Sequence, residues 1–338
     1  MLYQAEAGSG KIGQKVTKIK NMAIYITSGN RLNPVKEKSF DLEKDIQKLT
    51  EDNLGTLFNL KFVSGFSNNE FSVRAQEQDF YIDTLAFDEH QNSFVIIEYK
   101  KDRNFSVIDQ GFSYLSALLH NKAEFVLELN RRLGKTFDKS DIDWEQSRLI
   151  FISPEFTNYQ KNAINFKDLP FALYEVRAYE NGIVEFDPIK PFKTTESIQT
   201  FTKDTIVKDV TKEVKVYTLE DLIKSDWDET NSLLLEFEKQ LMALQQETRV
   251  KYTKKYIAYM SKHGRNYVEI VPNKRGLKIY YRFPYDYIKT SLEIIDCSKI
   301  GHWTNGQCHT LVSESEQIPE AVRLSKESFL YLHKDIYK

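Results

Sequence analysis

The stretch that decides the fold is Phe80-Tyr81-Ile82-Asp83, followed by the polar run Asp88-Glu89-His90-Gln91-Asn92 and by Phe94-Val95-Ile96-Ile97-Glu98-Tyr99-Lys100. The two outer segments are rich in Ile, Val, Phe and Tyr, and the run between them is polar, which is typical of a strand, a turn and a second strand. If the turn is centred between His90 and Gln91, antiparallel pairing sets position 83 opposite position 98. We therefore expect a β-hairpin on which Asp83 and Glu98 face each other.

Two facing carboxylates repel each other, and burial raises the pKa of a carboxyl group. A hard divalent cation offsets this cost, because Mg²⁺ binds one or two protein carboxylates and keeps positions for water and phosphate oxygens. Every second side chain of a strand shares a face, so Lys100 projects beside Glu98, where it could bind a phosphate or act on a water molecule. The hairpin thus predicts a metal-dependent site that cleaves phosphodiesters. The alternative is a surface hairpin with solvated charges.

This hairpin resembles the core of the PD-(D/E)XK nuclease superfamily, in which an Asp on one strand and Glu-x-Lys on the next form the site. Tyr81-Ile82 precedes Asp83, so the proline of the superfamily's name is absent. The stretch from Ser106 to Tyr114 resembles the Gln-x-x-x-Tyr element of the RecB-like and NucS-like branches. Gln110 and Tyr114 are four residues apart and share a helix face, and Ser106 with Asp109 is typical of a helix start.

Residues 41–57 have apolar residues at helical spacing and predict the first helix. In the superfamily this helix often supplies a further acidic ligand, so the resemblance implies Glu43, with Glu51 as the second candidate. Glu51 lies about 80° further round the helix, so the two side chains are not expected to reach one metal. An acidic residue in a first turn also complements the helix dipole without any metal, and this alternative stays open for Glu43.

From about Met22 to its end, the chain also resembles a bacterial family labelled "predicted transport protein", whose members pair a nuclease-like core with a C-terminal domain of unknown function. The sequence offers no support for transport, because no window approaches 18 consecutive apolar residues and no membrane partner is expected. There is no signal-peptide pattern. Only two cysteines, Cys297 and Cys308, are present. A disulfide framework is therefore excluded, and we expect a reducing compartment and a cytoplasmic protein.

The order of predicted elements indicates an α/β fold. A helix, a strand, the hairpin, a second helix and strands at 148–153 and 171–176 predict a restriction-endonuclease-like mixed sheet flanked by helices, followed by a smaller α+β domain. The 338 residues suggest two domains. We expect a weakly structured leader at 1–21, a nuclease-like domain at 22–192, a Thr- and Lys-rich linker at 193–217 and a C-terminal domain at 218–338. In the last, Leu234, Phe237, Leu241 and Leu244 predict a helical packing face, with a homodimer seam as the alternative.

The net charge of −2 conceals a basic stretch. Arg249 to Lys289 contains eleven Lys and Arg against two acids, a net of +9, and nine aromatic residues. Basic side chains neutralise phosphates and aromatic rings stack on bases, so this stretch predicts nucleic-acid contact. The predicted phosphate contacts are Lys251, Lys254, Lys255, Arg265, Lys274, Arg275 and Lys278, the first three on one face of a helix. The alternative is a solvated basic surface whose aromatic rings belong to the core.

Together these features predict a Mg²⁺- or Mn²⁺-dependent nuclease acting on nucleic acid, with DNA favoured over RNA, in defence or repair. Asp83 and Glu98 would hold the metal with the backbone carbonyl of Tyr99, and the resemblance adds Glu43. Lys100 would act on water or on the charge that develops at phosphorus, and the resemblance implies that Gln110 positions Lys100 or the phosphate. The alternatives are a catalytically silent nuclease fold that binds nucleic acid and a protein-interaction module.

Overall fold

The computed structural model describes residues 23–75, 77–101, 106–191, 196–245, 247–262, 264–300 and 304–334. The leader predicted at 1–21 lies outside the described residues. The chain divides into a small unit, made of residues up to Ser39 together with Arg177–Val184, and a large unit that holds the remainder. The small unit contains an antiparallel hairpin and a short strand that pairs with the end of β10, and its elements are β1 (Tyr25–Ser28), β2 (Arg31–Pro34), β3 (Glu37–Lys38) and η3 (Glu180–Gly182).

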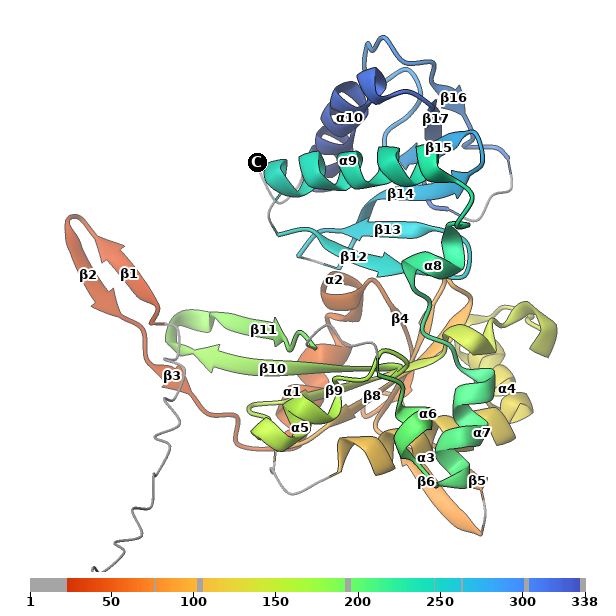
Figure 1. Ribbon diagram of the computed structural model, residues 1–338. Helices are drawn as coiled ribbons and strands as arrows, with labels where there is room; N and C mark the ends of the chain where they lie inside the picture. The colour runs from red at the N-terminus through yellow and green to blue at the C-terminus, as the bar shows by residue number, and fades with distance from the viewer. Residues whose placement is uncertain are drawn as a thin grey trace, which may run out of the picture. The chain divides into compact units, whose positions relative to one another are not determined.

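The large unit contains most of a mixed sheet with the strand order β11-β10-β9-β8-β7-β4 (Figure 1). β4, β7 and β8 pair antiparallel, whereas β8, β9 and β10 pair parallel. The strands are β4 (Lys61–Gly65), β7 (Thr84–Asp88), β8 (Ser93–Tyr99), β9 (Arg148–Ser153), β10 (Phe171–Tyr179) and β11 (Val184–Pro188). The predicted strands at 148–153 and 171–176 are confirmed, and so is the α/β class.

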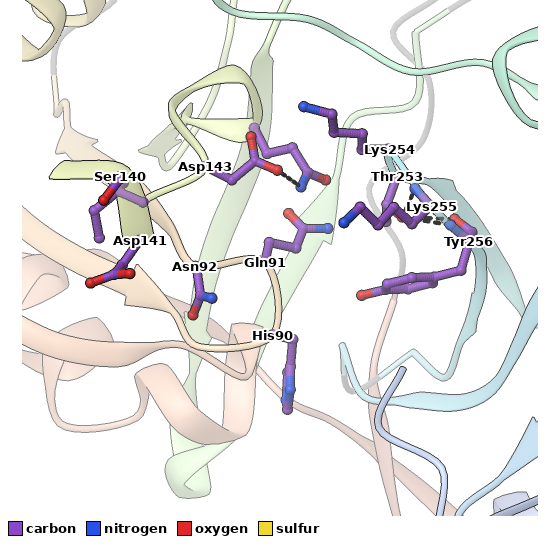
Figure 2. A pocket seen from close by; sticks show the side chains of 12 residues that line it. His90, Gln91, Asn92, Ser140, Asp141, Asp143, Thr253, Lys254, Lys255 and Tyr256 are labelled. Carbon is purple, nitrogen blue, oxygen red and sulfur yellow. Dashed lines mark hydrogen bonds between the residues drawn. The ribbon is translucent and has the colours of Figure 1, made fainter. Parts of the chain in front are cut away.

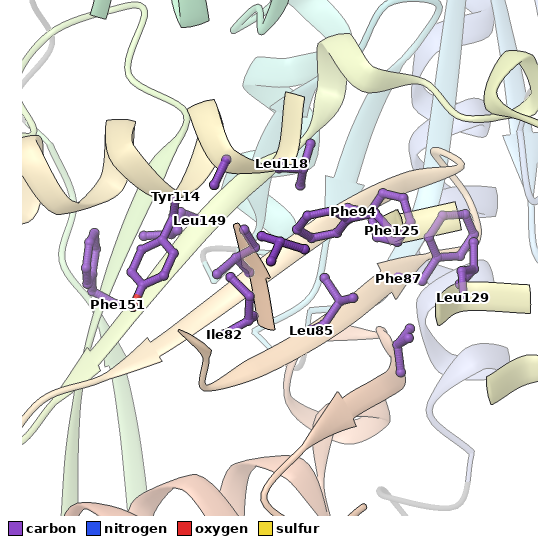
Figure 3. Packing of buried hydrophobic residues seen from close by; sticks show 14 of the residues in the cluster. Ile82, Leu85, Phe87, Phe94, Tyr114, Leu118, Phe125, Leu129, Leu149 and Phe151 are labelled. Atoms are coloured by element: carbon purple, nitrogen blue, oxygen red, sulfur yellow. The ribbon is translucent and has the colours of Figure 1, made fainter. Parts of the chain in front are cut away.

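Helices cover both faces of this sheet, as predicted. Successive residues of a strand point to opposite faces, so Phe87 and Phe94 pack with Phe125 in one core cluster (Figure 3), while Val95 and Ile97 pack in another with Ile46. The helical elements are α1 (Glu43–Glu51), α2 (Leu54–Phe58), α3 (Val107–His120), α4 (Lys122–Leu133), η1 (Lys139–Asp141), η2 (Trp144–Gln146) and α5 (Asn158–Ala163).

The hairpin has the predicted register, because Thr84 pairs with Ile97 and Leu85 with Ile96. Its first arm was predicted wrongly. Residues 80–82 belong to β6 (Gln78–Ile82), which pairs with β5 (Phe71–Ala75) in a separate two-stranded sheet. Asp83 lies in the bend between β6 and β7. The apolar alternation of β6 is the same as that of a hairpin arm, so the sequence pattern did not reveal this bend.

The segment predicted as a linker contains two helices, α6 (Ile198–Phe201) and α7 (Thr205–Glu213). Val207 and Val210 of α7 are buried in a cluster with Phe112 and Leu115 of α3. The predicted linker at 193–217 therefore carries two helices that its composition did not indicate. A few valines at helical spacing are enough to pack this short helix, although the stretch is rich in Thr and Lys.

The C-terminal part has a second sheet with the order β12-β13-β14-β15-β17-β16, in which each strand pairs antiparallel with its neighbours. Leu234, Phe237 and Leu241 are buried in its core, as predicted for a packing face, whereas Leu244 is 45% exposed. The elements are α8 (Leu219–Leu222), α9 (Asp228–Leu244), β12 (Arg249–Tyr252), β13 (Ile257–Met260), β14 (Asn266–Asn273), β15 (Gly276–Tyr281), β16 (Ile295–Asp296), β17 (Cys308–Val312), η4 (Ser315–Gln317) and α10 (Ile318–Leu332).

The basic stretch forms strands and turns in the described residues, so the helix expected for Lys251, Lys254 and Lys255 is wrong. Most of its aromatic rings lie in the core: Tyr259, Tyr267 and Tyr281 are fully buried. The alternative that placed these rings in the core is therefore correct for them. Within the described part of the chain, no helix has both the length and the apolar character that crossing a bilayer requires.

Candidate active site

The end of β8 carries the residues predicted for the site. Glu98 is 2% exposed, and the Lys100 ammonium lies 2.5 Å from its Oε1 atom. The backbone N–H of Tyr99 donates to Asp83 Oδ2 at 3.0 Å, which ties the bend before β7 to the end of β8. Asp83 directly precedes the Thr84–Ile97 pair and its carboxylate acts on the Glu98 carboxyl, so the structure brings together the three side chains that the hairpin pattern singled out.

Helix α3 adds Gln110 to this group. Its Nε2 donates to Glu98 Oε1 at 3.2 Å, and the Tyr114 hydroxyl donates to the carbonyl of Tyr81 at 3.2 Å. The predicted helix start is confirmed, because Ser106 Oγ accepts the N–H of Asp109. Gln110 and Tyr114 therefore point from one face of α3 toward the Asp83 bend and the end of β8.

Burial and the Asp83 carboxylate raise the pKa of Glu98 to about 8. Burial also raises the pKa of Asp83, although the N–H of Tyr99 and the Lys100 cation act against it. Burial acts to lower the pKa of Lys100, but the Glu98 carboxylate outweighs it and raises this pKa. Both carboxyl groups are therefore harder to ionise than in water, and a bound divalent cation would favour their charged forms.

Glu43 and Glu51 have different surroundings. Glu43, in the first turn of α1, accepts the N–H of Lys101 at 2.8 Å, and its charge helps to raise the pKa of Asp83. Glu51 is 6% exposed and accepts five hydrogen bonds, from Gln47 Nε2, the N–H groups of Phe66 and Ser67, and the hydroxyls of Ser67 and Thr84. Glu43 is therefore the acid of α1 that is directed toward the site, and Glu51 is already fully engaged.

The residues present fit a hard divalent cation. Glu98 Oε2 is buried and makes no hydrogen bond to any described residue. Tyr99 could contribute only its backbone carbonyl, because its side chain is buried in the core on the other face of the sheet, near Thr84. No group of three or more His, Cys, Asp or Glu side chains is placed for metal binding among the described residues. Mg²⁺ needs fewer protein ligands, since one or two carboxylates with carbonyl and water oxygens suffice.

Comparison with known proteins finds a relative along almost the whole chain. A Haemophilus influenzae protein described as uncharacterized is 34% identical over 309 residues, which are 91% of this chain and 99% of that protein. The chain belongs to the family of that protein. No protein-family model and no solved structure matches the chain. The description of this relative states no activity. A function for this chain must therefore be inferred from the geometry of its site.

The predicted phosphate contacts are spread over several places. Lys251 lies 3.8 Å from Asp88, and Lys254 lies 2.9 Å from Glu145, so both are paired with acids. Lys255 lies in a turn, where its N–H donates to Thr253, and Arg265 donates to the carbonyl of Leu332. Lys274 and Arg275 are exposed residues between β14 and β15. The Lys278 ammonium lies 6.0 Å from the ring centre of Tyr280.

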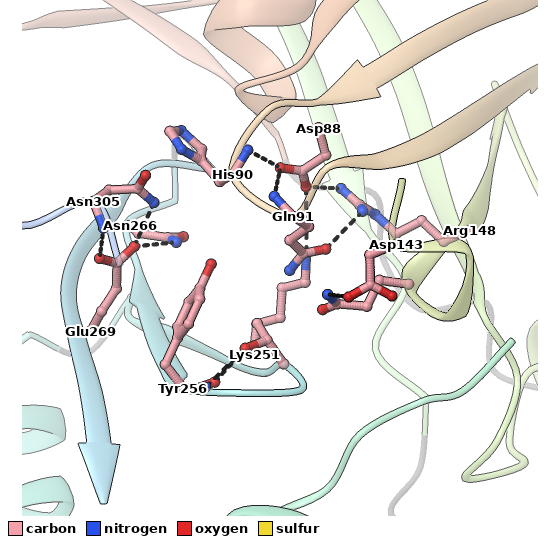
Figure 4. Close-up of polar contacts among 12 residues, drawn as sticks. Asp88, His90, Gln91, Asp143, Arg148, Lys251, Tyr256, Asn266, Glu269 and Asn305 are labelled. Atoms are coloured by element: carbon pink, nitrogen blue, oxygen red, sulfur yellow. Dashed lines mark hydrogen bonds and ion pairs between the residues drawn. The ribbon is translucent and has the colours of Figure 1, made fainter. Parts of the chain in front are cut away.

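Sequence reasoning missed a polar cluster at the turn between β7 and β8, drawn in Figure 4. Arg148 donates to Asp88 at 2.8 Å and to Gln91 Oε1 at 3.2 Å, and Lys251 approaches the same Asp88 carboxylate. Burial acts to raise the pKa of Asp88, but the cations of Arg148 and Lys251 outweigh it and lower this pKa. The three charged partners come from distant parts of the chain, and no local pattern could have linked them.

Proposed function

We propose that this protein is a Mg²⁺- or Mn²⁺-dependent nuclease of the PD-(D/E)XK type that hydrolyses phosphodiester bonds of nucleic acid, DNA in preference to RNA, in defence or repair in the cytoplasm. The observation that carries the proposal is the convergence of Asp83, Glu98, Lys100 and Gln110 around one buried carboxylate. A surface hairpin with solvated charges would not bury Glu98 or leave one of its oxygens without a donor.

In this proposal Asp83 and Glu98 hold the metal through their carboxylates, with the Tyr99 carbonyl and Glu43 as further oxygen ligands. A bound divalent cation would supply positive charge at the scissile phosphate and favour deprotonation of a water molecule. Glu98 Oε1 already accepts from Lys100 and Gln110, which leaves Oε2 as its free oxygen among the described residues. The two donors therefore orient the carboxylate that the metal needs.

Lys100 has two roles in the proposal. Its raised pKa keeps the ammonium protonated at neutral pH, so it can stabilise the negative charge that develops on the phosphoryl oxygens. It also fixes Glu98 through their 2.5 Å contact. Gln110 is a positioning residue, because its amide donates to Glu98 and through that carboxylate would position Lys100 or the phosphate.

The experiment that tests the proposal is a cleavage assay on purified protein. Linear duplex, circular duplex, single-stranded DNA and RNA are each incubated with Mg²⁺, Mn²⁺ or EDTA. We expect cleavage of at least one substrate with a divalent cation and none with EDTA. Absence of cleavage from every combination, by protein that is folded by circular dichroism, would favour the silent nuclease fold or the protein-interaction module.

The position of Glu43 leads to a prediction about its contribution. Glu43→Gln should lower the cleavage rate about tenfold or more, because the amide keeps an acceptor for the N–H of Lys101 but removes a negative charge near Asp83. Initial rates across a Mg²⁺ titration would show whether the metal requirement also rises. Asp45→Asn in the same helix turn is the matched control, and equal rates for Glu43→Gln and this control would exclude Glu43 from the site.

Nucleic-acid contact by the C-terminal part is proposed for Lys274 and Arg275, which are exposed on one turn. The double variant Lys274→Glu, Arg275→Glu should bind nucleic acid more weakly, and the slope of log affinity against log salt should fall by about 2, one for each lost phosphate contact. Lys203→Glu with Lys208→Glu, two exposed residues elsewhere, is the control of equal charge. Identical slopes for the two double variants would remove this turn from the interface.

A further inference from the structure

Tyr81 is an exposed aromatic residue two positions before the proposed metal ligand Asp83. Its side chain is 61% exposed, whereas its neighbours Phe80 and Ile82 pack against the core of the mixed sheet. In the pairing of β5 with β6, Ser72 lies opposite Tyr81. Because side chains alternate along a strand, the Tyr81 ring stands on the outer face of this two-stranded ribbon.

Helix α3 fixes the backbone that carries this ring. The Tyr114 hydroxyl donates to the Tyr81 carbonyl at 3.2 Å, and the ring centres of Tyr114 and Phe80 are 6.0 Å apart. Gln110, one turn earlier on α3, donates to Glu98 at 3.2 Å. The backbone of Tyr81 is therefore attached to the same helix face that orients the Glu98 carboxylate.

The short connection between Tyr81 and Asp83 limits how far the ring lies from the site. Two residues of extended chain span at most about 7 Å, and a stacked strand of nucleic acid advances about 3.4 Å per nucleotide. A strand with one phosphate at the Asp83 carboxylate would therefore bring a base one or two nucleotides away within reach of the Tyr81 ring.

The charges on the outer face of the ribbon compensate each other. Arg74 and Asp79 lie opposite each other on the face that carries Tyr81 and Ser72. One cation beside one acid gives no net attraction for phosphates. This face is therefore suited to contact through the aromatic ring and not through charge.

The cavity drawn in Figure 2 suits a strand less well. It has a volume of about 340 Å³, and its lining includes the carboxylates of Asp141 and Asp143, which repel phosphates. Lys254, which also lines it, is paired with Glu145 at 2.9 Å. The exposed ring beside Asp83 is thus the better candidate for a contact with substrate.

A single exposed aromatic residue is common on protein surfaces and needs no ligand. Tyr81 differs from that case because it adjoins the proposed metal site and its backbone is fixed there. An aromatic ring can stack on any unpaired base, since every base has a π face. Inside an intact duplex both faces of a base are covered by its neighbours, so a base must leave the stack before the ring can contact it.

We propose that Tyr81 stacks on an unpaired base beside the phosphate that is cut, and that the substrate is therefore a single strand or a duplex opened at that position. This inference rests on the proposed nuclease function and adds to it the form of the nucleic acid. Stacking is tolerant of sequence, so the contact selects for unpaired bases and not for a particular base.

Equilibrium binding of the full chain to fluorescently labelled strands tests this assignment. Anisotropy measurements compare a single strand, a blunt duplex and a duplex with an internal unpaired bubble, with Ca²⁺ in place of Mg²⁺ and again with EDTA. Gel electrophoresis checks that the strands stay intact. The readout is the ratio of the affinity for the single strand, or for the bubble, to the affinity for the blunt duplex.

Two substitutions at Tyr81 separate stacking from simple apolar contact. Tyr81→Leu keeps an apolar side chain but removes the ring, and we expect the affinity ratio to fall at least about fivefold. Tyr81→Phe keeps the ring, and we expect a ratio within about twofold of that of the unmodified protein. Both variants should keep the melting temperature, because the side chain is exposed.

Leu127→Ala on α4 is the control for loss of an exposed apolar side chain. Leu127 is 69% exposed. Its helix packs through Phe125 against Phe94, at the end of β8 opposite Glu98. We expect this variant to have the affinity ratio of the unmodified protein.

The proposal is overturned if no strand binds, if Tyr81→Leu keeps the ratio of the unmodified protein, or if Tyr81→Phe loses it as fully as Tyr81→Leu. Failure of this inference is distinguishable from failure of the nuclease assignment. Cleavage together with a ratio that does not depend on Tyr81 would reject the stacking contact alone. A ring-dependent ratio in a protein that cleaves no substrate would reject the nuclease and retain the stacking contact.

Discussion

Replacing Glu98 or Lys100 with alanine is expected to lower metal-dependent cleavage at least about 100-fold. Glu98→Ala removes the carboxylate that Lys100 and Gln110 both contact, so the metal loses a ligand and the two donors lose their common acceptor. Lys100→Ala leaves both carboxylates but removes the cation beside them. Single-turnover rates with Mg²⁺ and with Mn²⁺ separate the chemical step from substrate binding.

The matched control for this prediction is Lys101→Ala, which removes the exposed lysine next in sequence. Its ammonium interacts with the carbonyl of Asp41, and its backbone N–H, which contacts Glu43, is unaffected by the change. We expect a rate within a few-fold of the unmodified protein. Wild-type cleavage by Glu98→Ala would contradict the assignment of this site.

Metal-free stability provides a second readout that catalysis does not affect. The folded-state pKa of Glu98 is about 8, above its ordinary value of 4.5, so between these values the folded protein holds a proton that the unfolded chain releases. The free energy of unfolding therefore falls as pH rises through this window. Glu98→Gln cannot titrate, so in EDTA its melting temperature relative to the unmodified protein should increase from pH 5 to pH 8.5.

The parts of the site that sequence could predict are local in the chain. Asp83 and Glu98 are separated by one turn, and alternation along a strand places Lys100 beside Glu98, so a correct turn centre was enough to bring these groups together. The cap at Ser106 and the shared face of Gln110 and Tyr114 follow from spacing within a single helix. In each case one short segment contains all the necessary information.

The missed features depend on contacts between distant segments. Lys251, Lys254 and Lys255 have a spacing that suits a helix, but pairing of β12 with β13 makes Lys251 part of a strand. Residues 80–82 pair with β5 instead of continuing the hairpin, although their alternation is the same in either case. The contact of Lys251 with Asp88 links the two sheets of the large unit, and no periodicity in the chain indicates it.

Glu51→Ala is expected to lower the free energy of unfolding by about 3–5 kcal/mol, because several buried donors lose one charged acceptor together. The side chain is buried, and its loss would leave donors at Gln47, Ser67 and Thr84 and two backbone N–H groups without their acceptor. Each unsatisfied buried donor costs about 1–3 kcal/mol, reduced where water can enter the vacated space. Urea unfolding followed by circular dichroism measures the change, and Glu43→Ala, at the other end of the same helix, is the control.

Loss of Glu51 should also reduce cleavage, but by a different route from loss of a metal ligand. Gln47 donates both to Glu51 at 3.0 Å and to the backbone carbonyl of Asp83 at 2.6 Å. Glu51 therefore orients the Gln47 amide, and this amide in turn fixes the Asp83 bend. Glu51→Gln keeps much of the shape and should lose less stability than Glu51→Ala. If Glu51 were a metal ligand instead, Glu51→Ala would lose activity with unchanged stability, whereas a supporting role requires that stability and activity fall together.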